Sequence, residues 1–255
     1  MSFGVLVSTA FFFLGAIFAS FTTVIAERIY TGQSWLKGRS RCNSCRRVLS
    51  VPDLVPVFSW LFSRGRCRTC KAKVPGLYVL FEVSLGVLFV FSYLTLGLTL
   101  NLVVFLAVLI VLGFIVVYDL RHTIVPRGSS TLLIVLCLLF AFLSLKSMSA
   151  FLWIVGIALI IGFAFFLLYV LSRGRAMGLG DAPVALALAL LVGSAAIPGL
   201  LFSFWIGAVI GIVVLVLQHG GPRMGIEVPF VPFLAAGFLL AFFTQWNPLF
   251  LSLPF

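Results

Sequence analysis

The chain has 255 residues, of which 63% are hydrophobic and only 9% are charged. A soluble domain is about 45–50% apolar and about 25% charged, so this composition excludes a soluble globular protein and a disordered one. The formal net charge is +11, but the apolar runs are too long and too continuous for a nucleic-acid-binding domain or for the alternating strands of a membrane barrel. We therefore expect an all-α integral membrane protein, with membrane lipids and no nucleic acid among its partners.

The apolar runs predict about eight transmembrane helices. Their approximate ranges are 3–26, 77–96, 99–118, 129–145, 150–171, 182–195, 199–217 and 228–244. The sixth of these runs is short for a helix that crosses a bilayer. Residues 1–26 contain no Lys or Arg, whereas a secretory signal peptide begins with a basic region, so we expect an uncleaved first span with its N-terminus outside.

The positions of the basic residues support this topology. Residues 27–73 carry 11 Lys and Arg against two acids, Glu27 and Asp53. Basic loops stay on the cytoplasmic side and attract anionic headgroups, so this segment is expected inside. With the N-terminus outside, the eight spans leave Lys146 as the one basic residue on the outer side.

Three parts follow from this arrangement. We expect a first transmembrane helix over 1–26, a small cytoplasmic zinc-binding loop domain with four cysteines over 27–76, and a seven-helix membrane core over 77–255. No internal repeat stands out.

Four of the five cysteines form two C-x2-C pairs, Cys42 with Cys45 and Cys67 with Cys70. Each pair can present two thiolates from one tight turn, and two such turns complete a tetrahedral zinc site. A site with four thiolates has no open position, so its expected role is structural. Two disulfides are the alternative, but a cytoplasmic loop is kept reduced. Cys137 lies in an apolar run and is expected to be a small core residue.

Two acids stand at the ends of apolar runs. Asp119 ends the third run, and Asp181 begins the sixth, just after Gly178 and Gly180. Taken singly, Asp119 could pair with Arg121 and Asp181 could cap a helix. Taken together, both lie at the cytoplasmic border and can share a site.

Two neighbouring carboxylates can share a proton, so that one activates water while the other protonates the amide being cut. Asp119 and Asp181 therefore predict aspartic proteolysis. Gly178 and Gly180 would let a substrate backbone approach Asp181 closely. Glu82 lies about one turn into the second run, where a carboxylate is costly. It is predicted either to pair with a basic loop residue or to support the structure.

Further motifs follow one another along the chain. They are 20–28 (SFTTVIAER), the two cysteine pairs, 54–61 (LVPVFSWL), 65–70 (GRCRTC), Glu82, Asp119 with 124–126 (IVP), 178–181 (GLGD) and 229–237 (PFVPFLAAG). In this order they resemble the bacterial type IV prepilin peptidases, a family of GxGD membrane aspartic proteases, over nearly the whole chain.

The resemblance implies a specific activity. The family cuts the basic leader from prepilins and pseudopilins, after a glycine, at the cytoplasmic face of the bacterial inner membrane. Many members then methylate the new N-terminus with S-adenosylmethionine. It implies that Asp119 and Asp181 are the catalytic pair and that Glu82 is a supporting residue.

Three departures from the family pattern stand out: Arg127 in place of Asp, Thr23 in place of Asn, and 182–184 (APV) in place of a basic residue. Both aspartates survive them, so cleavage is expected. No pocket for S-adenosylmethionine is recognisable in the sequence.

Two other functions stay open. A non-enzymatic, zinc-stabilised transporter or assembly protein would place its ionisable groups near the middle of the membrane, whereas these acids lie at its border. A GxGD protease for another substrate would lack the four-cysteine loop, which the resemblance ties to the bacterial prepilin branch.

Recognition of the leader poses an electrostatic question. The loop over 27–73 is strongly basic, and a basic leader would be repelled by it. We therefore expect recognition to depend on acids such as Asp53, Glu82 or Glu227, or on embedding of the pilin helix in the membrane.

Overall fold

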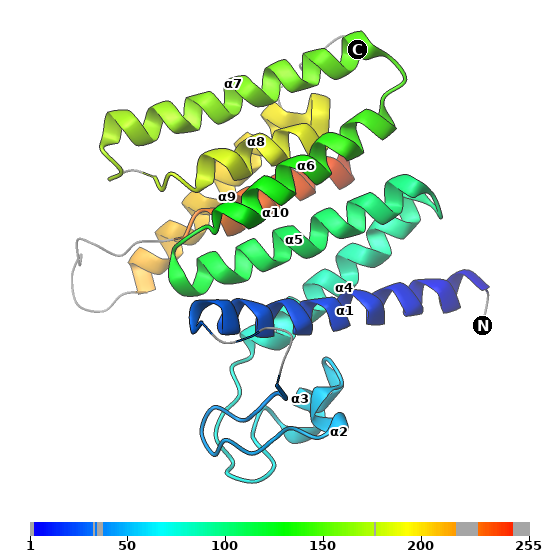
Figure 1. Cartoon of the computed structure of the whole chain (residues 1–255), viewed down its shortest axis with the longest axis vertical. Helices are drawn as coiled ribbons and strands as arrows, with labels where there is room; N and C mark the ends of the chain where they lie inside the picture. The colour runs from blue at the N-terminus through cyan, green and yellow to red at the C-terminus, as the bar shows by residue number, and fades with distance from the viewer. Residues whose placement is uncertain (1–2, 33, 35–37, 176, 218–228, 247–255) are drawn as a thin grey trace. The chain divides into compact units, whose positions relative to one another are not determined.

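The computed structural model describes residues 3–32, 34, 38–175, 177–217 and 229–246, and over this part of the chain it is helical, without extended strands. Figure 1 shows the helices in chain order. They are α1 (Phe3–Tyr30), α2 (Val51–Leu54), α3 (Phe58–Ser63), α4 (Leu77–Leu96), α5 (Leu100–His122), α6 (Arg127–Ser144), α7 (Met148–Ser172), α8 (Asp181–Val192), the 3-10 turn η1 (Gly193–Ala195), α9 (Ala196–Leu217) and α10 (Val231–Thr244). The all-α expectation is confirmed.

Six helical stretches of the described chain are long and apolar enough to cross a membrane. They are α1, α4, α5, α6, α7 and the continuous stretch Asp181–Leu217. The molecule therefore fits a multi-pass membrane protein. The expected count of eight spans is not confirmed, because the sixth and seventh runs join into one stretch and α10 has only 14 residues.

Contacts group the chain into two compact units, Met1–Leu102 and Val103–Phe255. In this grouping α1, the cysteine segment and α4 belong together. The expected boundaries near residues 26 and 76 stay a prediction.

In the first unit, α1 and α4 pack antiparallel. Phe11 stacks on Tyr93 with ring centroids 4.9 Å apart, and near the other end the Tyr78 hydroxyl donates to Glu27 at 2.8 Å. A Cβ atom on Gly86 of α4 would lie 2.9 Å from the backbone oxygen of Phe12 in α1. The absence of a side chain at this crossing lets the two backbones approach closely, as is common between membrane helices.

The cysteine segment of the first unit contains a short repeat. Residues 40–49 and 65–74 form two knuckles with the same hydrogen bonds. In each knuckle the backbone N–H of the first cysteine donates to the carbonyl five residues later, from Cys42 to Arg47 and from Cys67 to Ala72, both at 2.9 Å. An antiparallel bridge closes each knuckle. The sequence did not reveal this repeat, because few residues besides the cysteines recur in it.

In the second unit, α8 lies at the centre. It contacts α6, α7, α9 and α10, and ten of its 12 residues are buried. In Figure 1 it lies between α6 and α7. Twelve residues rise only about 18 Å, less than a hydrocarbon core of about 30 Å, so a helix this short suits a place among protein neighbours.

Candidate active site

Asp119 lies in the last turn of α5 and is buried. Its carboxylate accepts a hydrogen bond from the backbone N–H of Val231, the first residue of α10. Its Oδ2 atom is buried and has no hydrogen-bond partner among the described residues. An orphaned acceptor of this kind leaves capacity for a proton, a water molecule or a substrate amide.

Asp181 is the first residue of α8 and is also buried. Its Oδ2 accepts a hydrogen bond from the backbone N–H of Gly178 at 3.2 Å. A helix N-terminus favours a carboxylate because its backbone N–H groups lack intrahelical partners. Asp181 interacts electrostatically with Asp119, so the structure brings together the two acids that the sequence singled out.

A close contact joins the segments beside the two acids, which are 62 residues apart in the chain. A Cβ atom on Gly180 would lie 2.6 Å from Cβ of Val125, a separation that real side chains do not tolerate. Val125 belongs to the connection from α5 to α6, which begins at Thr123, in the left-handed region with φ +51°. Gly180 therefore lets the segment after Asp119 pack against the residue before Asp181.

Gly180 is closely packed. The space of its missing side chain is taken by Val125, and its expected role in substrate approach stays a prediction. Gly178 differs, because a Cβ there would meet only Asp181 Oδ2, at an ordinary 3.7 Å. Its backbone N–H is what positions Asp181.

Glu82 lies in the first unit, on α4, and is buried. Its Oε2 accepts the backbone N–H of Val57 at 2.7 Å, and its carboxylate is also hydrogen-bonded to the Ser20 side chain. These contacts join α4 to α1 and to the segment before α3, and the supporting role of Glu82 stays a prediction.

The four cysteines of the two knuckles converge. The sulfur atoms of Cys42, Cys45, Cys67 and Cys70 all lie within 4.8 Å of one another, and all are free thiols. The Sγ atoms of Cys42 and Cys70 are 3.8 Å apart. This agrees with the edge of a ZnS4 tetrahedron, about 3.8 Å for Zn–S bonds of about 2.3 Å. The cluster could therefore hold zinc, and the disulfide alternative is wrong for the structure.

Backbone N–H groups further prepare the cluster for a metal ion. The backbone N–H groups of Cys70 and Thr69 form hydrogen bonds with Cys67 and lower its pKa to about 6, with the larger effect from Cys70. In the same way, the backbone N–H groups of Cys45 and Ser44 lower the pKa of Cys42, with the larger effect from Cys45. Thiolates are the form in which cysteine binds zinc, so the backbone favours the ligand state at the first cysteine of each knuckle. At Cys70 the lowering effect of the Ala72 N–H is outweighed by desolvation and by hydrogen bonding with the other three cysteines, which raise the pKa of Cys70 to about 11.

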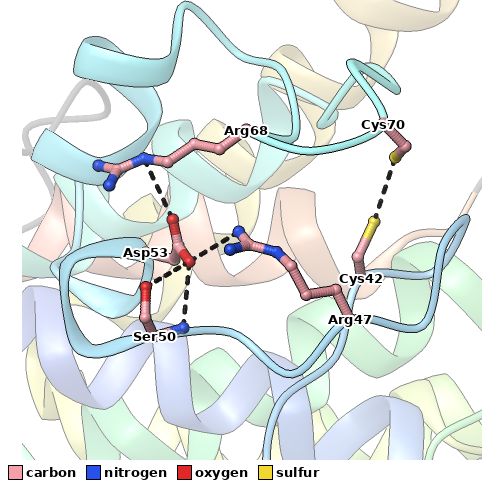
Figure 2. Close-up of polar contacts among 6 residues, drawn as sticks. All are labelled: Cys42, Arg47, Ser50, Asp53, Arg68 and Cys70. Atoms are coloured by element: carbon pink, nitrogen blue, oxygen red, sulfur yellow. Dashed lines mark hydrogen bonds and ion pairs between the residues drawn. The ribbon is translucent and has the colours of Figure 1, made fainter.

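Figure 2 shows how Asp53 joins the two knuckles. It accepts the hydroxyl of Ser50 at 2.7 Å and the backbone N–H of the same residue at 3.0 Å. It also pairs with Arg47 of the first knuckle at 2.9 Å and with Arg68 of the second at 3.2 Å. These contacts hold the pKa of Asp53 below its usual value. The Ser50 hydroxyl has the largest effect, followed by the Ser50 N–H and the two arginines.

These contacts bear on the acids expected to recognise a basic leader. Asp53 is already neutralised by two arginines, and Glu82 is engaged by Val57 and Ser20. Glu227 lies outside the described residues.

Sequence reasoning missed the roles of four residues at these sites. Val125 and Val231 fall inside the motifs at 124–126 and 229–237. The side chain of Val125 packs against Gly180, and the backbone N–H of Val231 donates to Asp119. Arg47 and Arg68 were counted as charges, and only the fold shows that they meet at Asp53.

The fold and these sites define a multi-pass helical membrane protein with a pair of buried carboxylates in one unit and a four-cysteine cluster in the other. Residues 103–216 match the Type IV leader peptidase family, and residues 13–96 match the Bacterial Peptidase A24 N-terminal domain. The chain belongs to this family of peptidases. Its two matched domains agree with the two compact units.

Two relatives carry the same name. The chain is 35% identical over 234 residues to the prepilin leader peptidase/N-methyltransferase of Myxococcus xanthus, covering 87% of this chain and 67% of the relative. It is 28% identical over 238 residues to the protein of that name from Bacillus subtilis, covering 91% and 92%. No solved structure matches the chain. Membership in a peptidase family makes the chain an enzyme and speaks against the transporter alternative.

Proposed function

We propose that this chain is a prepilin leader peptidase that cuts the basic leader from type IV prepilins or pseudopilins and then methylates the new N-terminus. The family match and the names of both relatives support cleavage and methylation. The structural observation that carries the proposal is the pair of buried, interacting carboxylates of Asp119 and Asp181.

In the proposed reaction the two aspartates share one proton. The ionised carboxylate takes a proton from a water molecule, whose oxygen attacks the carbonyl carbon of the scissile peptide bond. The protonated carboxyl gives its proton to the departing amine as the C–N bond breaks. The orphaned Oδ2 of Asp119 offers an acceptor for this proton traffic, while Val231 and Gly178 hold the carboxylates in place.

Zinc has a structural role in this proposal. Cys42, Cys45, Cys67 and Cys70 would hold it as a closed four-thiolate site that joins the two knuckles. S-adenosylmethionine would supply the methyl group.

The family is bacterial and acts at the cytoplasmic membrane, so we place the chain there. The first helix would have its N-terminus outside, with the cysteine domain and the aspartates at the cytoplasmic face. The excess of Lys and Arg in residues 27–73 supports this orientation.

The test is mass spectrometry of a prepilin incubated with the purified protein in detergent, with and without S-adenosylmethionine. Loss of the leader in both samples, with one added methyl group in the second alone, would support both activities. Loss of the leader without methylation would remove the second activity. An intact prepilin, beside protein that is folded and zinc-loaded, would contradict the proposal.

A further inference from the structure

Residues 51–63, which form α2, α3 and their connection, carry an unusual amount of exposed apolar surface for a segment outside the predicted spans. We name this segment the α2–α3 hairpin. Phe62 is 77% exposed and Leu61 is 60% exposed. The remaining exposed apolar side chains of the hairpin are those of Val51, Leu54, Val55 and Phe58. Exposed apolar surface of this kind marks an interaction site.

The backbone of the hairpin is tied to α4 at a level inside the predicted span. Val57 N–H donates to Glu82 at 2.7 Å, and Glu82 follows the first residue of α4 by five positions, a rise of about 8 Å. The same carboxylate is hydrogen-bonded to Ser20 of α1, and Ser20 precedes Glu27 by seven positions, a rise of about 10 Å. Both helices therefore place this contact beyond the polar border.

The hairpin reaches deeper along α1 through an aromatic contact. The ring of Phe58 stacks on that of Phe13 with centroids 5.9 Å apart. Phe13 precedes Glu27 by 14 positions, which is about 21 Å of helix rise. A hydrocarbon core is about 30 Å thick, so this contact lies well within it. Figure 1 shows α2 and α3 beside the middle of α1, away from its C-terminal end.

Several polar groups of the hairpin have partners within the protein. Irregular backbone is tolerated at membrane depth only where its N–H and C=O groups find partners. Val57 has φ +63° and ψ −54°, and this strained turn is held by Phe58 N–H donating to Pro56 O at 2.6 Å and by Glu82. The Trp60 indole N–H donates to Val74 O at 3.1 Å.

The one charge of the hairpin is paired with the knuckles. Asp53 is its one charged residue, and Arg47 and Arg68 of the two knuckles pair with it. Leu61 and Phe62, by contrast, are exposed, so the exposed part of α3 is apolar and carries no charge.

We propose that the α2–α3 hairpin re-enters the membrane between the two knuckles, and that Leu61 and Phe62 contact lipid acyl chains. In the same unit Leu80, in the first turn of α4, is 62% exposed. The hairpin thereby anchors the cysteine domain to the bilayer, although residues 27–76 were expected to lie wholly in the cytoplasm. The inference does not depend on peptidase activity.

The test measures the depth of a nitroxide in proteoliposomes of phosphatidylcholine and phosphatidylglycerol. Because the cysteines are needed for the metal cluster, the label is attached through a keto amino acid at Phe62. Matched proteins carry it at Leu80 of α4 and at Lys73 of the second knuckle, which is exposed outside the predicted spans. Collision with oxygen reports lipid, and collision with a water-soluble nickel chelate reports solvent.

We expect the oxygen-to-nickel collision ratio at Phe62 to match that at Leu80 and to exceed that at Lys73 several-fold. A ratio at Phe62 like that at Lys73 would overturn the proposal, because the hairpin would then lie in water. Low collision with both reagents would also overturn it, because a second copy or another protein would then cover the surface. Zinc content and melting temperature confirm folding, and a label that disturbs either is moved to Leu61.

Discussion

Asp53 in the first unit and the pair Asp119 and Asp181 in the second are carboxylates in opposite surroundings. Asp53 accepts the hydroxyl and the N–H of Ser50 and two guanidinium groups. Asp181 accepts one backbone N–H, and Asp119 keeps a buried oxygen without a partner among the described residues. The donors around Asp53 make it a cross-link between the two knuckles, whereas the buried pair keeps the Oδ2 acceptor of Asp119 available.

Removing one carboxylate at a time gives the strongest test of the difference between Asp53 and the buried pair. Asp119→Asn and Asp181→Asn each leave the shape of the side chain but remove a group that can exchange a proton. We expect each to reduce cleavage by about 10³-fold or more, within the range of general acid–base catalysis. Immunoblots of prepilin processing in cells that express each variant measure this. Asp53→Asn is the matched control and should leave processing near the wild-type level.

The contact between Gly180 and Val125 gives a second large effect. Gly180→Ala forces its Cβ against that of Val125 and moves Asp181 relative to Asp119. We expect cleavage to fall about 10²-fold, as for a displacement of about 1 Å in an active site. Gly178→Ala, where a Cβ finds ordinary contacts, is the matched control and should retain most activity.

A double variant checks that this loss comes from the named contact. Val125→Gly removes the opposing Cβ, so the pair Val125→Gly with Gly180→Ala should recover part of the activity lost in Gly180→Ala alone. If the two losses simply add, the effect of Gly180 has another origin, because residues in direct contact are expected to be coupled.

Loss of a thiolate tests the cysteine cluster. Cys42→Ser should lower bound zinc and the yield of folded protein, because the closed site joins two knuckles that have little core of their own. Atomic emission measures the zinc content. Cys137→Ala is the control, since Cys137 is buried in α6, and it should keep the full zinc content. Equal zinc in both variants would argue against the four-cysteine site.

Asp53→Asn should have the smallest effect and act on stability. We expect a loss of about 1 kcal/mol, because the two arginines are partly exposed and solvent screens the ion pairs. A carboxylate with a lowered folded pKa stabilises the protein above its unfolded pKa and loses this contribution only as the pH falls through the folded value. The difference in melting temperature between Asp53→Asn and the wild type should therefore stay constant from about pH 7.5 to about pH 5. Below about pH 4, near the pKa of an aspartate in an unfolded chain, the difference should shrink, because the unfolded wild type binds a proton before the folded one does. A difference that stays unchanged at lower pH would mean that the pKa of Asp53 is not lowered.

Much of both sites could be predicted from the sequence. The C-x2-C spacing predicted a four-thiolate cluster because a tight turn brings two sulfurs together, and the structure brings all four within 4.8 Å. The acids at the ends of apolar runs predicted the pair Asp119 and Asp181, because both ends were expected at one face of the membrane.

The rest depends on packing that hydropathy does not encode. An apolar residue facing lipid and one facing protein look alike in sequence, so α8 could be counted as a span although most of its residues are buried among other helices. The N–H of Val231 reaches Asp119 through the backbone, which side-chain patterns cannot reveal. The α2–α3 hairpin is too short to register as a span, and its depth follows only from its contacts with Glu82 and Phe13.

One experiment separates the two kinds of carboxylate. The experiment compares purified wild-type protein with the Asp119→Asn, Asp181→Asn and Asp53→Asn variants, matched for zinc content and melting temperature. Each protein is incubated in excess over a prepilin substrate, and mass spectrometry measures the fraction of prepilin cleaved in a single turnover. We expect complete cleavage by the wild type and by Asp53→Asn, and an intact prepilin with either variant of the buried pair. Cleavage by Asp119→Asn or Asp181→Asn at a rate near that of the wild type would contradict a two-aspartate mechanism.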